Sequence, residues 1–338
     1  MNSFFEFEAQ KALKDVQSPI LHLNDLIDWQ KLSLKIGNLY KSQECDLGGN
    51  RHYDSLKMFK AILLGQWHNL SDPKLSQSLS VRLDFMLFTG FNPSDGIPDD
   101  TTLCRFRNRL VKANRLSSLL EEVNAQLEER NLKVKASEGA VLDASVIQSA
   151  ARPRKVIEQI PEDRNEPDSD TETFVEYSVD KEANFLIKGK KVFYGYKLFM
   201  SVDQEDGYIE SGHITPASNS EIKQFKEAIE HLPNKNDRWY FADKGFASKE
   251  NREALKDFNM HDGIMNKAVR NRPLSSFEKR VNKWISSYRF IVEQGFGTLK
   301  RIFEFSRASY YGIEKTTGQF HLKAICFNLL KAFNKTLA

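Results

Sequence analysis

The stretch AVLDASVI, residues 140–147, decides the fold class of this chain. It is a short apolar run interrupted by one acid, Asp143, and such runs are typical of strands buried on both faces. An unpaired carboxylate inside a buried strand is costly. The stretch therefore predicts a buried strand, and the costly position of its carboxylate makes Asp143 a candidate functional residue.

The residues after this strand alternate between strand and helix signals. A long helix is expected from about Ser275 to Phe303, broken near Ser286, and a last amphipathic helix from Phe320 to Phe333. The other expected elements are four strands and two helices: 192–202, 208–214, 239–242 and 263–265, then 221–231 and 248–255. This order predicts a mixed α/β fold, with a mixed sheet flanked by helices.

The residues before the strand have a helical pattern instead. Apolar residues recur at three- and four-residue spacing from Leu56 to Trp67, and helix-start signals occur at Ser71 and Asp99. Residues 1–50 are weakly patterned, with one short helix indicated between Leu21 and Trp29. We therefore expect an all-helical domain ahead of the α/β part.

These patterns divide the chain into three expected parts. Residues 1–50 form an N-terminal extension, residues 51–135 a helical DNA-binding domain, and residues 136–338 the α/β catalytic domain. An acidic, proline-containing loop insertion is expected at about 153–190, because its composition does not favour a packed core.

Three arginines lie on the helix that starts near Asp99. Positions i and i+2 diverge by about 200° around a helix, whereas i and i+4 share a face. Arg105 and Arg109 can therefore reach DNA together, and Arg107 is expected to point elsewhere. Two interpretations remain open: a helix that enters a DNA groove in helix-turn-helix fashion, or a plain helical bundle with exposed arginines.

The charges of the chain are distributed unevenly. The net charge is only +3. The segment from Lys267 to Arg307 is nevertheless strongly basic and has only Glu278, Glu293 and Glu304 as acids. Such a cluster indicates phosphate binding, although a solvated helix face gives the same pattern. Its ten basic residues are Lys267, Arg270, Arg272, Lys279, Arg280, Lys283, Arg289, Lys300, Arg301 and Arg307.

Several classes of protein are disfavoured by composition. The three cysteines, Cys45, Cys104 and Cys326, are far apart, so neither a disulfide framework nor a zinc site is indicated. No run of 18 apolar residues occurs, so a membrane protein is not expected. The sequence predicts a soluble, cytosolic protein.

Three acids are the candidates for catalysis and metal binding. Asp143 lies in the first strand, Asp243 ends the strand 239–242, and Glu293 lies in the basic helix. If the two strands are neighbours and the helix packs beside them, the three carboxylates meet at one edge of the sheet. Mg²⁺ prefers oxygen ligands, and two such ions can clamp the attacking and leaving oxygens of a phosphoryl transfer.

Two cations accompany Glu293 on its helix. Arg289 precedes it by four residues and Lys300 follows it by seven, which is about one and two turns. The three side chains therefore share a helical face, where the cations can hold DNA phosphates. An ordinary salt bridge between Arg289 and Glu293 is the alternative interpretation.

The run YRFIVEQGFGTLK, residues 288–300, resembles the signature helix of bacterial insertion-sequence transposases of the DDE class. Within that class the chain is most similar to the four/five superfamily, closest to the five-type group. Arg289, Glu293 and Lys300 match the family pattern, whereas Ser286 stands where the family has Tyr. The segments around Asp143 and Asp243 resemble the strands that carry the first and second acids of the family.

The resemblance implies an RNase H-like catalytic core and a cofactor, Mg²⁺, with Mn²⁺ as a substitute. It implies a DNA transposase that binds the terminal inverted repeats of an insertion sequence, cleaves the element ends and joins the 3′ ends to target DNA. The implied partners are double-stranded DNA and further copies of the chain, in a homodimer or a higher synaptic oligomer. The implied location is the bacterial cytosol, at the nucleoid.

Two rival functions stay open at this point. An RNase H-like nuclease without strand transfer would share the same three acids. A domesticated transposase that acts only as a DNA-binding protein would keep the helical domain, although the presence of Asp143, Asp243 and Glu293 disfavours that alternative.

Overall fold

The computed structural model describes residues 4–13, 18–37, 39, 52–92, 96–135, 137–152 and 180–337. Cys45 and most of the expected acidic insertion lie outside these residues. Within them, Cys104 and Cys326 are free thiols. No helix in the described ranges is both long enough and apolar enough to cross a membrane.

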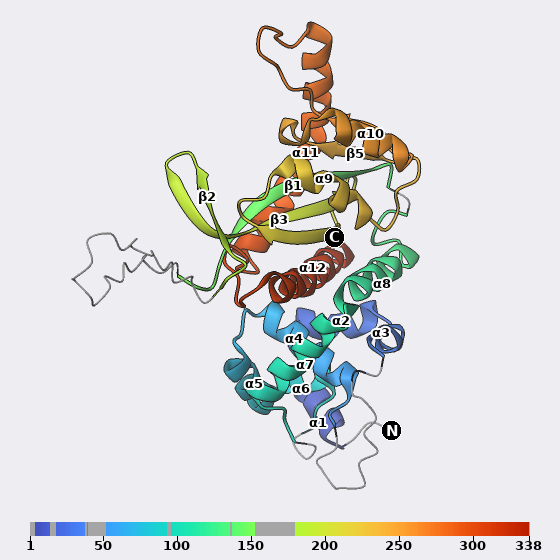
Figure 1. Cartoon of the computed structure of the whole chain (residues 1–338). Coiled ribbons are helices and arrows are strands. Elements are labelled where there is room, and N and C mark those ends of the chain that lie inside the picture. The colour runs from blue at the N-terminus through green and yellow to red at the C-terminus, as the bar shows by residue number, and fades with distance from the viewer. Residues whose placement is uncertain are drawn as a thin grey trace, which may run out of the picture.

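The chain begins with short helices that pack together (Figure 1). Asp54 and Asp99 cap two of them, since their carboxylates accept hydrogen bonds from the backbone of Lys57 (2.9 Å) and Thr102 (2.6 Å). The helices are α1 (Phe4–Ala12), α2 (Pro19–Leu26), α3 (Trp29–Ile36), α4 (Ser55–Trp67), α5 (Asp72–Val81), α6 (Leu83–Thr89), α7 (Asp100–Lys112) and α8 (Arg115–Glu129). Because α2 and α3 pack against α6, α4 and α8, residues 19–36 belong to the same core as the later helices.

The described part of the chain then forms one six-stranded sheet. β1 pairs antiparallel with β3 and parallel with β5, β4 runs antiparallel beside β3, and β6 runs parallel beside β5. The strands are β1 (Gly139–Gln148), β2 (Asn184–Lys188), β3 (Lys191–Asp203), β4 (Ile209–Pro216), β5 (Trp239–Ala242) and β6 (His261–Ile264). The spatial order β4-β3-β1-β5-β6 is that of an RNase H-like sheet, so the predicted mixed α/β fold is confirmed.

Helices cover both faces of this sheet. α9 (Glu221–Glu230) and α10 (Lys249–Asp257) pack on one face, while α11 (Ser276–Arg301) and α12 (Ile313–Thr336) lie on the other. Side chains alternate along β1, so Asp143 faces the same side as Val141, which packs in the core beneath α11 and α12. The fold therefore turns the acid of the first strand toward α11.

α12 joins the sheet to the N-terminal helices and lies between them (Figure 1). Its residues from Gly318 to Leu329 are all buried, as expected of a helix enclosed on every side. Asn328 ties three elements together, because its amide bonds to Asn124 of α8 (2.6 Å) and to both backbone groups of Ile209 in β4 (2.9 Å each). The helical and α/β parts thus share one continuous core.

Three helix predictions need correction. α11 is unbroken at Ser286. On either side of that position, Tyr288 stacks on Phe241 of the sheet and Trp284 meets the same ring edge-on, which holds the helix against the sheet. The last helix starts at Ile313 and not at Phe320. The helix expected between Leu21 and Trp29 is two helices, since the Asp28 side chain accepts bonds from Gln30 and Lys31 and starts α3 anew.

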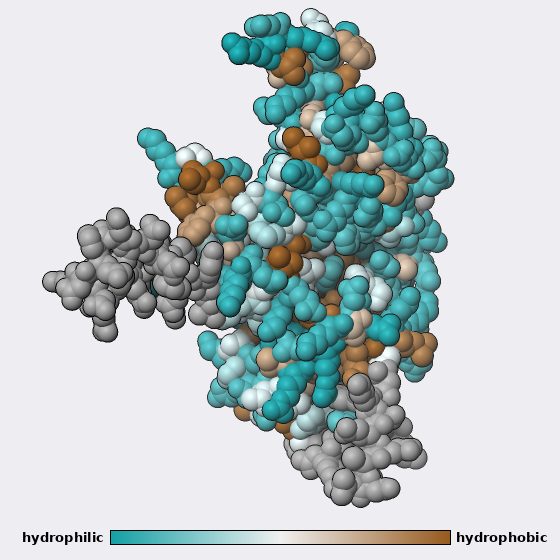
Figure 2. Space-filling model, viewed as in Figure 1, coloured by the Kyte–Doolittle hydropathy of each residue, from teal (hydrophilic) through white to brown (hydrophobic). Residues whose placement is uncertain are grey.

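The expected loop at 153–190 also needs correction at its C-terminal end. Residues 184–188 form β2, which pairs with the first residues of β3 as a hairpin. The hairpin projects from the body (Figure 1), and its apolar side chains Phe185, Ile187 and Val192 are exposed (Figure 2). Its backbone pairing, and not burial of its side chains, makes this segment a strand.

Candidate active site

The sheet register places the two aspartates opposite each other. β1 and β5 are parallel neighbours, with Val141 beside Phe241, and continuing this register by two residues puts Asp143 beside Asp243. β5 ends at Ala242, so Asp243 lies just past the strand, where it caps a 3₁₀ turn, η2 (Lys244–Phe246), by accepting a bond from the Lys244 amide (2.7 Å). The two acids therefore meet at the C-terminal edge of β5, with Asp143 in the middle of β1, just past the last residue pair that β1 forms with β5.

α11 brings the third acid to this edge. The helix begins with a capping box between Ser275 and Glu278, and it lies against β1, β3 and β5. Gly295 faces the sheet, where an added Cβ would come within 3.1 Å of the Met200 side chain. This close packing aims the adjacent face of α11, with Arg289 and Glu293, over the middle of β1 and the end of β5.

The three carboxylates meet around the guanidinium of Arg289. Its Nη2 lies 3.4 Å from Asp143 Oδ2 and 3.8 Å from Glu293 Oε1. Its Nη1 lies 3.6 Å from Asp243 Oδ1. Acids from β1, the end of β5 and α11 are thus gathered around one positive charge, although they are 50 to 150 residues apart in the chain.

The local environment makes Asp143 harder to ionise than an ordinary aspartate. Burial raises its pKa, and the negative charges of Asp243 and Glu221 act in the same direction. The Ala144 amide and Arg289 oppose this shift. A carboxylate of this kind gains from any additional cation placed beside it.

Lys300 also faces β1. Its Nζ donates a 2.6 Å hydrogen bond to the hydroxyl of Ser145, two residues beyond Asp143 on the same face of the strand. Burial lowers the pKa of Lys300, and the nearby charge of Lys188 adds to this effect. The structure therefore places both predicted cations of α11 on the face that carries the acids.

The oxygen donors of Asp143, Asp243 and Glu293 suit a hard divalent ion, but the positions of their side chains do not. Carboxylate oxygens are the ligands that Mg²⁺ prefers. Among the described residues, however, no three acidic, histidine or cysteine side chains are close enough to hold one ion as they stand. The acids instead surround an arginine.

A fourth carboxylate near the site was missed from the sequence. Glu221, the first residue of α9, raises the pKa of Asp143 by its charge. A Cβ on Gly245 would come within 2.8 Å of Glu221 Oε2, and Lys197 Nζ of β3 lies 3.5 Å from Glu221 Oε1. The sequence indicated only a helix over residues 221–231, which gives no hint that Glu221 lies near Asp143.

The arginines of α7 divide between surface and interior. Arg105 and Arg109 are exposed, whereas the Arg107 side chain is only 6% exposed. Arg107 binds both oxygens of Asp72 (2.6 and 2.8 Å) and lies 4.1 Å over the ring of Tyr310. The prediction that Arg107 points away from its two neighbours is confirmed, and the physical reason is this buried ion pair.

We expect replacement of Arg105 and Arg109 by alanine to weaken DNA binding. If they contact phosphates only, cognate and random DNA lose affinity alike, and the salt slope shrinks by about one per lost contact. If they contact bases, cognate binding falls by about 1–3 kcal/mol per contact while random DNA is spared. Fluorescence anisotropy on both DNAs at several salt concentrations separates the cases. Unchanged DNA binding in the double variant would show that α7 does not contact DNA and serves only to pack the helical bundle.

Arg107→Ala should instead destabilise the fold. Removing one partner of a buried ion pair leaves an uncompensated charge on Asp72, which costs about 3–5 kcal/mol. Urea unfolding followed by circular dichroism measures the loss. Arg105→Ala is the matched control on the same helix and should stay within about 0.5 kcal/mol of the wild type. Equal unfolding midpoints for Arg107→Ala and Arg105→Ala would contradict this account.

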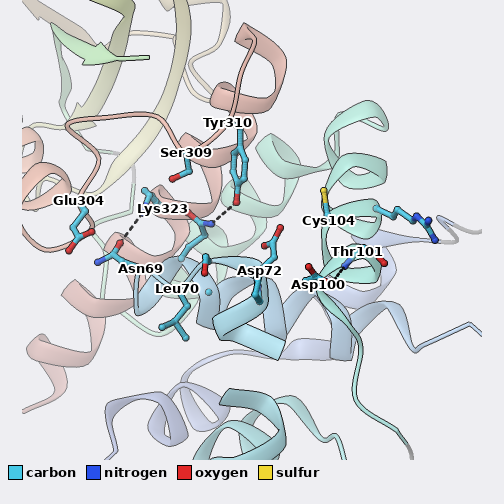
Figure 3. A pocket seen from close by; sticks show the side chains of 15 residues that line it. Asn69, Leu70, Asp72, Asp100, Thr101, Cys104, Glu304, Ser309, Tyr310 and Lys323 are labelled. Atoms are coloured by element: carbon cyan, nitrogen blue, oxygen red, sulfur yellow. Dashed lines mark hydrogen bonds between the residues drawn. The ribbon is translucent and has the colours of Figure 1, made fainter. Parts of the chain in front are cut away.

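A separate pocket lies between the N-terminal helices and the segment joining α11 to α12 (Figure 3). It measures about 740 Å³, and Arg105, Tyr310 and Lys323 are among its lining residues. Lys323 Nζ donates to Asn69 Oδ1 (3.1 Å) and to the carbonyl of Phe303 (2.5 Å), and burial lowers the pKa of this lysine to about 8. None of the lining residues comes from β1, β5 or α11, so the pocket is distinct from the edge with the acids.

Comparison with known families identifies the class. Residues 138–329 match the family model described as "Transposase DDE domain", and residues 7–109 match "Transposase domain (DUF772)". The first match covers more than half of the chain, from just before β1 to within α12. The chain therefore belongs to the DDE transposases, a family that uses divalent metal ions.

Within that class, the chain is similar to bacterial insertion-sequence transposases. It is 42% identical, over 234 residues, to the transposase for insertion sequence element IS1106 of Neisseria meningitidis serogroup B, with 69% of this chain and 78% of that protein covered. The predicted membership of the bacterial insertion-sequence DDE transposases is confirmed.

Two solved structures show weaker likeness. One is the piggyBac transposase synaptic complex with hairpin DNA, at 12% identity and a TM-score of 0.42, covering 99% of this chain and 76% of that one. The other is a pre-cleavage Mos1 transpososome, at 9% identity and a TM-score of 0.24, covering 90% and 84%. Both scores are too low to define a fold, so the RNase H-like assignment rests on the strand order of the sheet.

Proposed function

We propose that this transposase binds the terminal inverted repeats of its insertion sequence, cleaves the DNA at the element ends and joins the 3′ ends to target DNA. The reaction is two-metal-ion phosphoryl transfer, with Asp143, Asp243 and Glu293 as the catalytic and metal-binding residues. One observation carries the proposal: acids from three separate elements converge within 4 Å of a single cation. They are thus close enough to share a positive charge.

The chain's own residues set the positions of the acids. The Ala144 amide holds Asp143 Oδ1 (2.8 Å) and leaves Oδ2 directed toward the centre of the cluster. The Lys244 amide fixes Asp243 at the end of β5 in the same way. Mg²⁺, with Mn²⁺ as its substitute, would supply activation of the attacking oxygen and stabilisation of the departing one. No side chain of the protein then needs to act as the nucleophile.

The basic residues of α11 and of the segment before it would hold DNA beside the acids. The N-terminal end of α11 and the preceding loop extend beyond the sheet (Figure 1). Lys267, Arg270, Lys279, Arg280 and Lys283 are exposed there. Exposed lysines and arginines attract phosphates over several ångströms. This end of α11 would therefore bind the backbone of duplex DNA beside Asp143 and Lys300. Arg289 and Lys300 would contact phosphates at the cleavage site itself.

The helical domain, residues 51–135, would bind the element ends, with Arg105 and Arg109 as contacts. Two element ends must be brought together for a transfer reaction, so the working form would be a homodimer or a higher synaptic oligomer. The place of action would be the bacterial cytosol, at the nucleoid.

The deciding experiment is incubation of the purified protein with duplexes that carry its own element's ends, together with a target plasmid and Mg²⁺. Cleaved ends and joined products on a denaturing gel are expected. Cleaved ends without joined products would favour an RNase H-like nuclease without strand transfer. A gel shift without any cleavage would favour a protein that has kept only DNA binding.

A further inference from the structure

Arg289 contacts all three acids but is fixed strongly by none. Its distances to them, 3.4, 3.6 and 3.8 Å, all exceed the roughly 2.7–2.9 Å of a short charge-assisted hydrogen bond. The guanidinium is therefore shared among the carboxylates of Asp143, Asp243 and Glu293. One positive charge shared in this way offsets part of the repulsion among the three carboxylates without committing the arginine to one partner.

The rest of the Arg289 side chain does not anchor it either. Its Nε is buried and has no hydrogen-bond partner among the described residues. A buried donor without a partner is unfavourable, so the present position of the side chain is stabilised by the three acids and by little else.

The side chains of the acids, as they lie, are also too far apart to share one metal ion. The described acidic, histidine and cysteine side chains form no group that could hold one. With the guanidinium among them, the carboxylate oxygens face a planar, singly charged group instead of a compact divalent ion. The guanidinium in this position opposes entry of a metal ion, because its positive charge and that of the ion repel each other.

We propose that Arg289 is a positioning residue that takes the place of the metal in the metal-free protein, holding Asp143, Asp243 and Glu293 together until the ion displaces it. The inference rests on the proposed metal-binding role of the three acids. It adds a second role for Arg289, since the displaced guanidinium is then available to a DNA phosphate. Competition between Arg289 and the metal ion follows directly, so loss of the arginine must strengthen metal binding.

The test is direct metal binding by the full chain without DNA, with Mn²⁺ as the probe and electron paramagnetic resonance to count free ions. Arg289→Gln should bind Mn²⁺ at least about tenfold more tightly than the wild type. Arg289→Lys should be intermediate, because one ammonium keeps the charge but cannot span three carboxylates. Arg301→Gln, an exposed residue at the other end of α11, removes the same charge and should leave the affinity unchanged.

Thermal unfolding gives a second readout. In chelator, Arg289→Gln should melt below the wild type, because the three acids repel one another without their shared cation. Adding Mg²⁺ should raise its melting temperature more than that of the wild type, since tighter binding stabilises more at equal ion concentration. If Arg289→Gln does not fold without metal, Arg289→Lys provides the same comparison at smaller amplitude.

The outcomes separate this inference from the proposed function. Equal Mn²⁺ affinity in Arg289→Gln and in the wild type overturns the inference. A second outcome also overturns it: Arg289→Gln binds Mn²⁺ more tightly, while Arg289→Lys binds it as the wild type does. That result would be an effect of charge alone. Asp143→Asn serves as the control for the site. If it binds Mn²⁺ like the wild type, the proposed metal role of the acids fails as well. If it loses the ion while Arg289→Gln changes nothing, only the role of Arg289 fails.

Discussion

Asp143→Asn, Asp243→Asn and Glu293→Gln should each reduce DNA cleavage by at least about a thousandfold. Each variant keeps the shape of the side chain and removes one of three negative charges that meet around Arg289. Loss of one carboxylate ligand from a two-metal site removes about 4 kcal/mol or more of transition-state stabilisation, which is this factor in rate. Single-turnover cleavage of labelled element ends measures it.

Binding of the element ends should remain largely intact in the same three variants. The acids lie at the edge of the sheet, whereas the predicted end-binding arginines lie on α7, on the far side of α12 (Figure 1). Glu253→Gln is the matched control, because Glu253 forms only a surface pair with Lys249 on α10. A variant that still nicks its end at a rate near that of the wild type would remove that residue from the active site.

Removal of divalent metal should abolish cleavage altogether, and this is the second large effect. Asp143, Asp243, Glu293 and the nearby Glu221 present only oxygen donors, so Mg²⁺ or Mn²⁺ is the expected partner. Dialysis against chelator should bring cleavage to background, and addition of Mg²⁺ or Mn²⁺ should restore it. The readout is the same cleavage assay, with anisotropy to follow DNA binding.

A control separates loss of metal from loss of fold. No cysteine or histidine cluster that could hold a structural metal occurs in the described residues, so chelator should leave the melting temperature of the wild type nearly unchanged. Strong cleavage in excess chelator would contradict the two-metal mechanism. Loss of the folded signal in chelator would show instead that the protein needs metal for stability.

That Asp143, Asp243 and Glu293 come together could be expected from the sequence because each sits in a distinctive local context. Asp143 interrupts an apolar run, and Asp243 follows one and precedes a lysine and a glycine. Glu293 lies one turn after Arg289 and two turns before Lys300. These contexts depend on strand and helix periodicity, which is a local property of the chain.

Other features depended on contacts between distant segments. Glu221 reaches the neighbourhood of Asp143 only because α9 starts beside the turn at Gly245. β2 is a strand through its pairing with β3, although its apolar side chains are largely exposed. α11 runs unbroken past Ser286 because aromatic residues on either side of that position pack against Phe241 of the sheet.

The sequence by itself determined the α/β class and the helical N-terminal part, and it singled out one acid inside a strand and one at the end of another, since periodicity, capping residues and charge are all local. Only the tertiary structure decided how these parts meet. It set the register that brings Asp143 beside Asp243, buried Arg107 on Asp72, and placed Arg289 among the three carboxylates. An arginine on a helix face is equally compatible with a surface pair, a DNA contact or a stand-in for a metal ion. Which of these it becomes depends on the surfaces packed against that face, and they come from strands about 50 and 150 residues away in the chain.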